Sequence, residues 1–287
     1  MVKGIMGSAL VGVVAIAMGA GVAHADAPPV VAAADTKTTG GAEVSGDTTP
    51  DVTKTPEAPT TVAWPIEIIN RPVVLPKGAW SAGLGLSANN DFSAVGADAT
   101  GAWGLSYGVT DQLSVGVGYG IGVEPSSDGK GPVGLNVGYG YYSGDTLSLT
   151  ATASAGYDFA GETMGPLSVG TYVWYNITPV ITLITPGGQV SVGLEDPNEI
   201  SFSLPVSVGY QATKNIFATF DTNLMPNLGV KDSDNMVIGS DTLPVGVSGY
   251  FSPNRQMDIG VSISTDAKNS PGDNMSFGLV FLYYGGV

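Results

Sequence analysis

The sequence predicts an all-β fold, a closed antiparallel transmembrane β-barrel of about twelve strands that follows a disordered N-terminal tether. Three observations predict this fold: apolar residues that alternate with small or polar ones, turns that are alternately short and long, and aromatic residues that recur at one end of the alternating stretches. Beyond the N-terminal apolar segment, no second run of 18 or more apolar residues follows, so we expect no membrane-spanning helix.

The first 25 residues have the pattern of a secretory signal peptide. Lys3 gives a positively charged start, residues 5–22 form an apolar run of small residues, and residues 23–25 match an A-x-A cleavage site. Cleavage after Ala25 would remove the single histidine, and the chain contains no cysteine. The mature chain would then lack the residues of disulfides, Cys/His metal sites and Ser-His or Cys-His catalysis. We therefore expect no enzyme activity, no catalytic residues, no cofactor and no metal.

Residues 26–63 form a second segment that precedes the barrel. They are Ala, Thr, Pro and acidic residues without periodicity, which is typical of a disordered tether that cannot bury a core. The composition changes at Trp64, and alternating segments continue from there to the end. The expected organisation is a signal peptide over 1–25, a tether over 26–63 and an outer-membrane-type barrel over 64–287.

The charge content narrows the classes of protein. Charged residues make up 12% of the chain, about half of the share of about 25% that is usual in globular domains. The 25 acidic residues outnumber the 10 basic ones, which argues against nucleic acid and anionic lipid surfaces as partners. A chain that is apolar overall and poor in charge needs an apolar environment for its surface, and a bilayer supplies one.

Residues 113–123, LSVGVGYGIGV, show the alternation most clearly. The odd positions are apolar and the even positions are Ser or Gly, so a strand there has one apolar face and one nearly bare face. Apolar residues outside and small or polar residues inside are typical of a transmembrane barrel, which also pairs every backbone group without an open edge. The same pattern recurs over residues 80–87, 102–108, 147–157, 200–210 and 257–264.

The turns and the aromatic residues predict the number of strands. Short turns near residues 109, 143, 212 and 252 alternate along the chain with longer polar loops. An aromatic residue precedes each short connection or closes the last strand, which predicts six hairpins and an aromatic girdle at one membrane surface. The alternation fails over residues 178–189, so the seventh strand (178–195) is not placed. The girdle residues are Tyr107, Tyr141, Tyr175, Tyr210, Phe251 and Tyr283.

The same parity predicts which residues line the lumen. The acidic members have no Lys or Arg with them at inward strand positions, so an open lumen is expected to prefer cations. The two aromatic members would narrow the interior near the short turns, and the tether or residues 64–78 are candidates for a plug. A filled interior, in which inward polar residues bond only to one another, is the alternative. The predicted lumen residues are Asp98, Asn136, Asp158, Tyr172, Trp174, Asp221, Asn223 and Asp258.

Two short stretches resemble known ligand-binding motifs. Residues 129–134, GKGPVG, match the pattern G-x-G-x-x-G, but a dinucleotide site needs a helix after it and none is expected there. Residues 231–235, KDSDN, offer closely spaced oxygen ligands for Ca²⁺ but lack the remaining spacing of an EF-hand loop. Both stretches are interpreted as outward loops.

Residues near both ends of the barrel carry a resemblance to a known family. RPVVLPKGAW at 71–80 is similar to the RPLTLPKG-like start of some outer-membrane barrels. The alternation of Phe277, Leu279, Phe281 and Tyr283 is similar to the assembly signal of that family, although this chain ends in Gly-Gly-Val. Over about three quarters of its length the chain resembles Gram-negative outer-membrane β-barrels of the porin or small-molecule transporter type. The resemblance implies the cell outer membrane as the location, and outer-membrane lipid, small solutes and the barrel-insertion machinery as partners.

These observations favour one function and leave a second open. The expected function is a passive channel or transporter for small solutes, mildly cation-preferring if the lumen is open. The alternative is a non-conducting structural or adhesion barrel that tethers the outer membrane to the cell wall or to partners. A secreted β-sandwich also has short alternating strands, but the scarce charge and the aromatic residues at one end of the strands favour the barrel.

Overall fold

The computed structural model describes residues 64–91, 97–122, 131–159, 161–187, 189–194, 199–224, 228–231, 236–238, 243–268 and 274–287. The predicted signal peptide and tether, residues 1–63, lie outside these residues. Within the described part of the chain, no helix is long and apolar enough to cross a bilayer. The 3₁₀ turn η1, Ile68–Asn70, precedes the strands.

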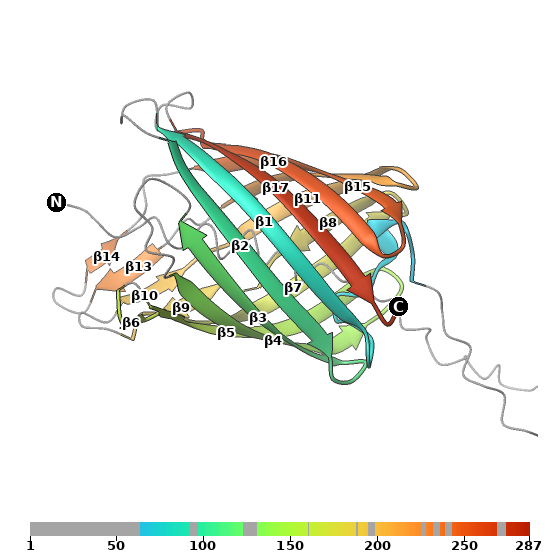
Figure 1. Cartoon of the computed structure of the whole chain (residues 1–287), viewed down its shortest axis with the longest axis horizontal. Helices are drawn as coiled ribbons and strands as arrows, with labels where there is room; N and C mark the ends of the chain where they lie inside the picture. Colours follow the sequence, from blue (N-terminus) through green and yellow to red (C-terminus); the bar gives the residue numbers. More distant parts are fainter. Residues whose placement is uncertain are drawn as a thin grey trace, which may run out of the picture. The chain divides into compact units, whose positions relative to one another are not determined.

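All described strands belong to one antiparallel sheet. Strand β1 pairs with both β2 and β17, so the sheet closes on itself as the barrel in Figure 1. The strands are β1 (Trp80–Asp91), β2 (Ala97–Gly108), β3 (Leu113–Gly122), β4 (Pro132–Ser143), β5 (Leu147–Asp158), β6 (Thr163–Met164), β7 (Leu167–Thr178), β8 (Ile181–Thr185), β9 (Val190–Val192), β10 (Glu199–Phe202), β11 (Pro205–Thr213), β12 (Ile216–Asn223), β13 (Leu228–Lys231), β14 (Met236–Ile238), β15 (Pro244–Asn254), β16 (Met257–Asp266) and β17 (Asn274–Gly285).

The barrel wall consists of twelve strands, because several of the short strands continue one another. β8 and β9 both pair with β7, and they pair with β11 and β10 respectively. In the same way β12 pairs with β11 and β13 pairs with β10, so β12 and β13 form one wall strand. β15 pairs with β12 and β14 pairs with β13, so β14 and β15 form the next wall strand. β6 pairs with β5, as β7 does. The predicted fold, a closed antiparallel barrel of about twelve strands, is confirmed.

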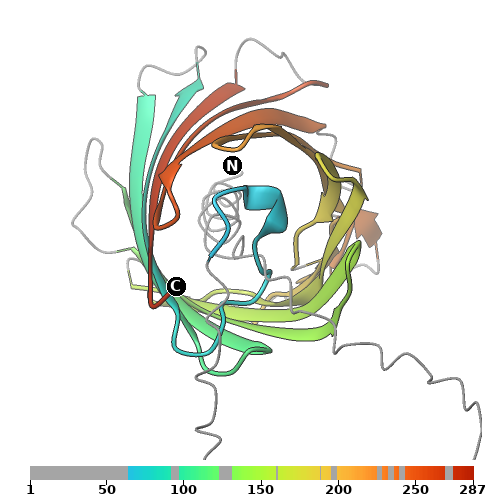
Figure 2. The ribbon, with the colours of Figure 1, turned by 90° about the vertical axis from the view of Figure 1, so that its right-hand side faces the viewer.

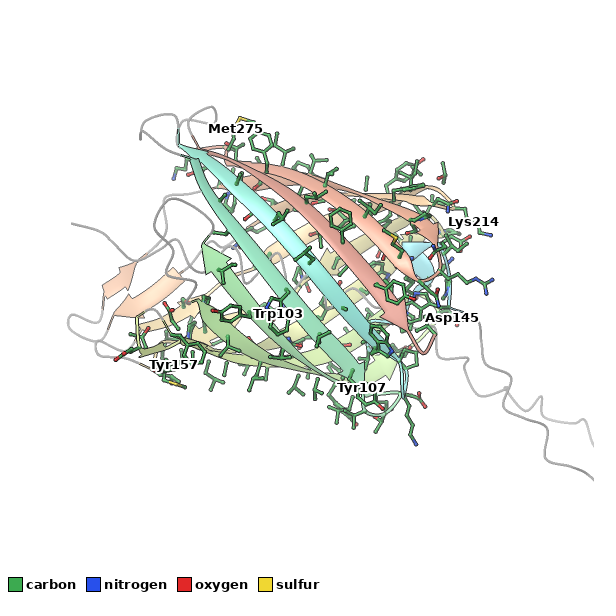
Figure 3. All side chains as sticks on the ribbon, in the orientation of Figure 1. Trp103, Tyr107, Asp145, Tyr157, Lys214 and Met275 are labelled. Carbon is green, nitrogen blue, oxygen red and sulfur yellow. The ribbon has the colours of Figure 1, made fainter. Side chains whose placement is uncertain are left out.

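The alternation seen in the sequence is the alternation between the two faces of this wall. Outward positions carry exposed apolar side chains such as Leu135 (61%) and Val261 (58%). Inward positions carry small or polar side chains, for example Ser106, Thr150 and Ser207, which are all buried. Figure 3 shows the side chains that project from the outside of the barrel, with Trp103 and Tyr107 on β2 among them.

Five short connections between neighbouring wall strands lie at one end of the barrel. They join β2 to β3, β4 to β5, β7 to β8, β11 to β12 and β15 to β16. Asp145 and Lys214, in two of these turns, are both labelled at the right-hand end of Figure 3, where the chain also ends in Figure 1. We call this end the short-turn end.

The seventh wall strand, which the sequence pattern did not place, consists of β8 and β9 with a break at residues 186–189. Thr182 and Ile184 are both buried, whereas Ile181 and Leu183 alternate with them on the other face. Ile184 belongs to an apolar cluster inside the barrel. The strand therefore carries large apolar residues on both faces, and a pattern of apolar outside and polar inside fails at this place.

Candidate functional site

Residues 64–79, which precede β1, lie inside the ring of strands at the short-turn end (Figure 2). We call them the plug segment. Pro65, Pro72 and Pro76 interrupt it, and because proline has no backbone N–H, this stretch is a poor candidate for a further wall strand. Its apolar side chains are instead buried in the interior, and they include Trp64, Ile68, Ile69, Val74, Leu75 and Ala79.

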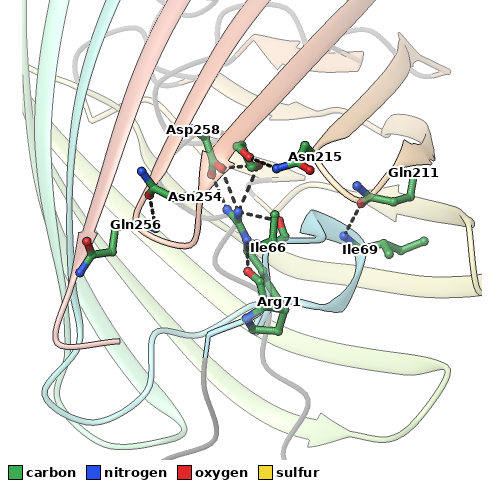
Figure 4. A network of polar contacts seen from close by, with 10 residues as sticks. Ile66, Ile69, Arg71, Gln211, Asn215, Asn254, Gln256 and Asp258 are labelled. Atoms are coloured by element: carbon green, nitrogen blue, oxygen red, sulfur yellow. Dashed lines mark hydrogen bonds and ion pairs between the residues drawn. The ribbon is translucent and has the colours of Figure 1, made fainter.

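The centre of the plug segment is a buried ion pair. The guanidinium of Arg71 is bidentate on the carboxylate of Asp258 in β16: Nη1 contacts Oδ2, and Nη2 donates to Oδ1 at 2.9 Å (Figure 4). Ser252 of β15 completes the group, because its hydroxyl donates to Asp258 Oδ1 at 2.6 Å and accepts from Arg71 Nη2 at 3.2 Å. Arg71 is 0% exposed and Asp258 2%.

The remaining donors of Arg71 hold the plug segment in its own conformation. Nε donates to the carbonyl of Pro65 at 3.1 Å, and Nη2 also donates to the carbonyl of Ile66 at 2.9 Å. The guanidinium lies 5.3 Å from the ring centroid of Tyr284 and 5.9 Å from that of Trp64. Burial by itself would lower the pKa of the Arg71 guanidinium, but the hydrogen bonds and charge of Asp258 outweigh burial and raise this pKa above its ordinary value.

A row of aromatic side chains from three wall strands packs beside η1. Tyr172 and Trp174 of β7 stack at a centroid distance of 6.5 Å with an interplanar angle of 10°, and Trp174 stacks on Phe217 of β12 at 6.2 Å and 19°. Tyr250 of β15 continues the row at 6.4 Å from Phe217. The plug residues Ile68 and Ile69 and the wall residue Ile184 pack into the same cluster.

Further contacts fix the two ends of the plug segment. The backbone N–H of Ile69 donates to the side chain of Gln211 in β11 at 3.1 Å. At the other end, the N–H of Gly78 donates to the carbonyl of Gly108 at 2.8 Å, and Gly108 donates back to Ala79 at 2.9 Å. Trp64 packs against Tyr284 at a centroid distance of 5.3 Å. The plug segment is therefore attached to the wall by side chains and by its last two residues rather than by a strand ladder.

A cavity of about 300 Å³ lies against the plug segment and this aromatic row. Ile68, Tyr172, Trp174, Ile184, Phe217 and Tyr250 form its apolar part, which we call the floor. Polar residues on the inner face of β11, β12, β15 and β16 also line the cavity, namely Ser207, Thr219, Asp221, Ser248, Ser262 and Ser264. The lumen thus combines an apolar floor with a wall of hydroxyls and carboxylates.

Five of the eight predicted lumen residues line this cavity, namely Tyr172, Trp174, Asp221, Asn223 and Asp258. The amide oxygen of Asn223 accepts a hydrogen bond from the N–H of Leu204 at 3.0 Å, at the break between β10 and β11. Asp221 Oδ2 accepts hydrogen bonds from Thr219 at 2.8 Å and Ser248 at 3.1 Å. That these residues line a conducting path stays a prediction.

The other three predicted lumen residues lie in β4, β5 and β2, and they are not among the residues that line this cavity. Asn136 of β4 extends its amide over Gly116, where an added Cβ would lie 2.6 Å from its oxygen. Asp158 is the last residue of β5 and is partly exposed. Asp98 lies in β2 opposite Asn89, and its side chain lies outside the described part of the structure.

The six predicted girdle residues are all exposed on the outer face. Their exposed fractions lie between 44% and 50%, and each lies within the last residues of its strand, next to the short-turn end. Amphipathic aromatic side chains near the ends of membrane-spanning strands are typical of a membrane surface. Their contact with an interface stays a prediction. The residues are Tyr107, Tyr141, Tyr175, Tyr210, Phe251 and Tyr283.

The strand alternation does not indicate Arg71, because Arg71 lies outside the strands. The signal that could have found Arg71 is a single cation in a stretch of Ile, Val, Leu and Pro that directly follows a polar tether. The predicted lumen residues also omit Phe217, whose inward parity is that of Asp221, and Tyr284, whose parity opposes that of Tyr283. Of the two loop motifs, residues 132–134 begin strand β4 rather than a helix, and residues 232–235 lie outside the described part.

The barrel has the fold of outer-membrane channels whose structures are known. The NanC porin matches with a TM-score of 0.53 at 7% identity, over 70% of this chain and 98% of that protein. An outer-membrane channel from Pseudomonas putida F1 matches with a TM-score of 0.52 at 13% identity, over 74% and 97%. The KdgM porin in complex with disordered oligogalacturonate matches with a TM-score of 0.48 at 8% identity, over 71% and 98%.

No protein-family model matches the sequence, and no curated protein sequence matches it significantly. Identities of 7–13% show a shared fold alone, the closed antiparallel β-barrel that these outer-membrane porins and channels have. This confirms the resemblance that the sequence carries. Among the described residues, no group of three or more His, Cys, Asp or Glu side chains is placed to hold a metal ion.

Proposed function

We propose that this protein is an outer-membrane channel for small solutes and that the plug segment closes its lumen at the short-turn end. The observation that carries the proposal is a closed barrel with a polar inner face whose interior is occupied by its own N-terminal segment, fastened by the Arg71–Asp258 pair. Barrels of about eight strands are filled by their own side chains, whereas those of sixteen or more leave a channel. With twelve strands and a lining of Gly, Ser, Ala and Thr, an additional segment is what closes this lumen.

The proposal includes a cation preference when the plug segment is displaced. Asp98, Asp158, Asp221 and Asp258 occupy inward parity, and the basic residue within the described strands, Lys231 at the end of β13, is opposite the acidic residue Glu199 of β10. With the plug segment in place, Arg71 compensates the charge of Asp258. Its departure would remove a cation from the lumen and leave the carboxylate of Asp258 without its partner, and a passage walled by low-dielectric material amplifies the effect of such charges.

The proposed location is the cell outer membrane, reached by export through a cleaved signal peptide and by the barrel-insertion machinery. The band of exposed apolar side chains on the outer face supports lipid contact, since a soluble protein rarely exposes so extended an apolar surface. The proposed partners are outer-membrane lipid and small solutes.

The closed short-turn end also favours the second candidate, a structural or adhesion barrel that does not conduct. Swelling of proteoliposomes in solutions of small sugars and amino acids of graded size distinguishes the two. Under the channel proposal, the wild-type protein gives slow swelling, and the variant Asp258→Asn, in which the buried Arg71 loses its counter-charge, gives faster swelling. No swelling with either protein, both correctly folded, contradicts the channel and supports the structural barrel.

A further inference from the structure

The cavity above the plug segment has an apolar, aromatic floor. Trp174 is 2% exposed and Phe217 2%, and the two rings stack with an interplanar angle of 19°. Tyr172 lies almost parallel to Trp174, and Ile68 of the plug segment borders the same floor. The part of the cavity that these residues line is apolar, so it offers a hydrocarbon group a place out of water.

A single carboxylate lies on the wall just above this floor. In the pairing of β12 with β15, Phe217 is opposite Tyr250, Thr219 opposite Ser248, and Asp221 opposite Gly246. A strand advances by about 3.3 Å per residue, so the backbone of Asp221 lies two inward-facing positions further from the short-turn end than that of Phe217. The carboxylate of Asp221 lies at the level of Thr219 and Ser248, because Thr219 Oγ1 and Ser248 Oγ both donate to its Oδ2. Gly246 leaves the opposite position without a side chain.

This carboxylate differs from the other one that lines the cavity. Asp258 is paired with Arg71, whereas Asp221 receives its two side-chain hydrogen bonds from neutral hydroxyls. Within the described part of the chain, no Lys or Arg contacts Asp221. The site therefore presents one carboxylate that is paired with Arg71 and one carboxylate that is hydrogen-bonded to two hydroxyls.

We propose that the cavity binds a small organic cation, an amine or ammonium with a hydrocarbon body, and that this is the substrate class of the channel. The ammonium lies against Asp221, and the hydrocarbon body lies on the floor formed by Trp174, Phe217 and Tyr172. The cavity of about 300 Å³ is at the lower end of the range for small-molecule sites. A metal ion would gain nothing from the aromatic floor, and a neutral hydrocarbon would leave the carboxylate without its counter-charge. This inference rests on the proposed function.

Calorimetric titration of the purified protein in non-ionic detergent tests the inference with three probes. Phenethylamine carries both the ring and the charge, 2-phenylethanol carries the ring without the charge, and methylammonium carries the charge without a ring. We expect phenethylamine to bind at least about tenfold more tightly than either of the others. 2-Phenylethanol replaces a charge-assisted hydrogen bond by a neutral one. Methylammonium lacks the hydrocarbon body that would be buried on the floor.

Two variants assign the binding to this cavity. Asp221→Asn should weaken phenethylamine binding by about tenfold and leave 2-phenylethanol binding unchanged, while Trp174→Leu should weaken both. Asp145→Asn, in an exposed turn, is the matched control and should change neither. Heat-dependent migration on a gel verifies that each variant forms the barrel.

Equal binding of 2-phenylethanol and phenethylamine, or phenethylamine binding that Asp221→Asn leaves intact, contradicts the inference. Because the titration needs no conductance, a protein that binds phenethylamine without passing solutes would refute the channel and retain the site. A protein that passes solutes without binding phenethylamine would refute the site and retain the channel.

Discussion

Arg71 in the plug segment and Asp258 in β16 form a bidentate ion pair across 187 positions of the chain. Both side chains are buried, and removing one partner of a buried pair costs roughly 3–5 kcal/mol, because the other charge is left without compensation. The plug segment is held by side chains and by its junction with β1. Under the proposed function, this segment leaves the interior when the pair is broken, and the pair therefore decides whether the lumen is closed.

Release of the plug segment can be followed through a single cysteine, since the chain contains none of its own. Ile69, which is 2% exposed, is replaced by Cys and reacted with a hydrophilic maleimide. We expect slow labelling in Ile69→Cys alone and labelling about tenfold faster or more when Asp258→Asn is added. The double replacement Arg71→Met with Asp258→Met should restore slow labelling, because an apolar pair leaves no buried charge. Identical rates in all three backgrounds would show that the ion pair does not hold the plug segment.

The assignment of the two faces of the wall can be tested with adjacent residues of β4. Leu135 is 61% exposed on the outer face, and an arginine facing lipid costs roughly 2–4 kcal/mol. Gly134, its neighbour, faces inward, and a Cβ added there would meet nothing within 4 Å. We expect Leu135→Arg to lower the folded fraction after insertion into lipid and Gly134→Arg to lower it much less. Equal tolerance of both changes would contradict the assignment of the two faces, and the reverse order of tolerance would mean that inside and outside are exchanged.

The junction between the plug segment and the wall predicts a strict requirement for glycine at position 108. A Cβ there would lie 2.0 Å from the carbonyl oxygen of Pro76 and 2.4 Å from that of Leu75. Gly108→Ala should lower the free energy of unfolding by about 1–3 kcal/mol, as overpacking does. Gly249→Ala is the control, because its Cβ would lie 4.0 Å from the nearest atom and should be nearly neutral. Urea titration of the folded band compares them, and similar midpoints would contradict the described junction.

The sequence predicts the strands of the barrel only where apolar residues alternate with small or polar ones. The six aromatic residues at the strand ends predicted six hairpins, and twelve wall strands are observed. Alternation predicts a strand only where its two faces meet different surroundings. At β8 the inward residue Ile184 packs into an apolar cluster, so both faces resemble each other and the strand could not be placed.

The plug segment has no period at all, and its position in the interior depends on residues far away in the sequence. Residues 64–78 are a candidate plug because of their place in the chain, but the partner of Arg71 is 187 positions away. The inward parity of Asp258 therefore predicts a carboxylate in the lumen without predicting its partner. The structure pairs Asp258 with Arg71, because a segment outside the strands supplies the cation.

Cation preference is expected in the channel once the plug segment is released. In an Asp258→Asn background, a salt gradient across a planar bilayer should give a reversal potential of the cation-selective sign, and the preference should fall at high salt as screening shortens the reach of each charge. Adding Asp98→Asn and Asp221→Asn together should reduce the preference further. A reversal potential of the anion-selective sign would contradict the assignment of these aspartates to the lumen.

The most direct test of the account is single-channel recording of the wild-type protein beside Asp258→Asn and beside the double variant Arg71→Met, Asp258→Met. The account predicts that the wild type and the double variant are closed for most of the recording, because an intact ion pair or an apolar pair keeps the plug segment in the lumen. It predicts long-lived openings of uniform conductance for Asp258→Asn. Equal open times and equal conductance in all three proteins would contradict the claim that the plug segment closes this barrel.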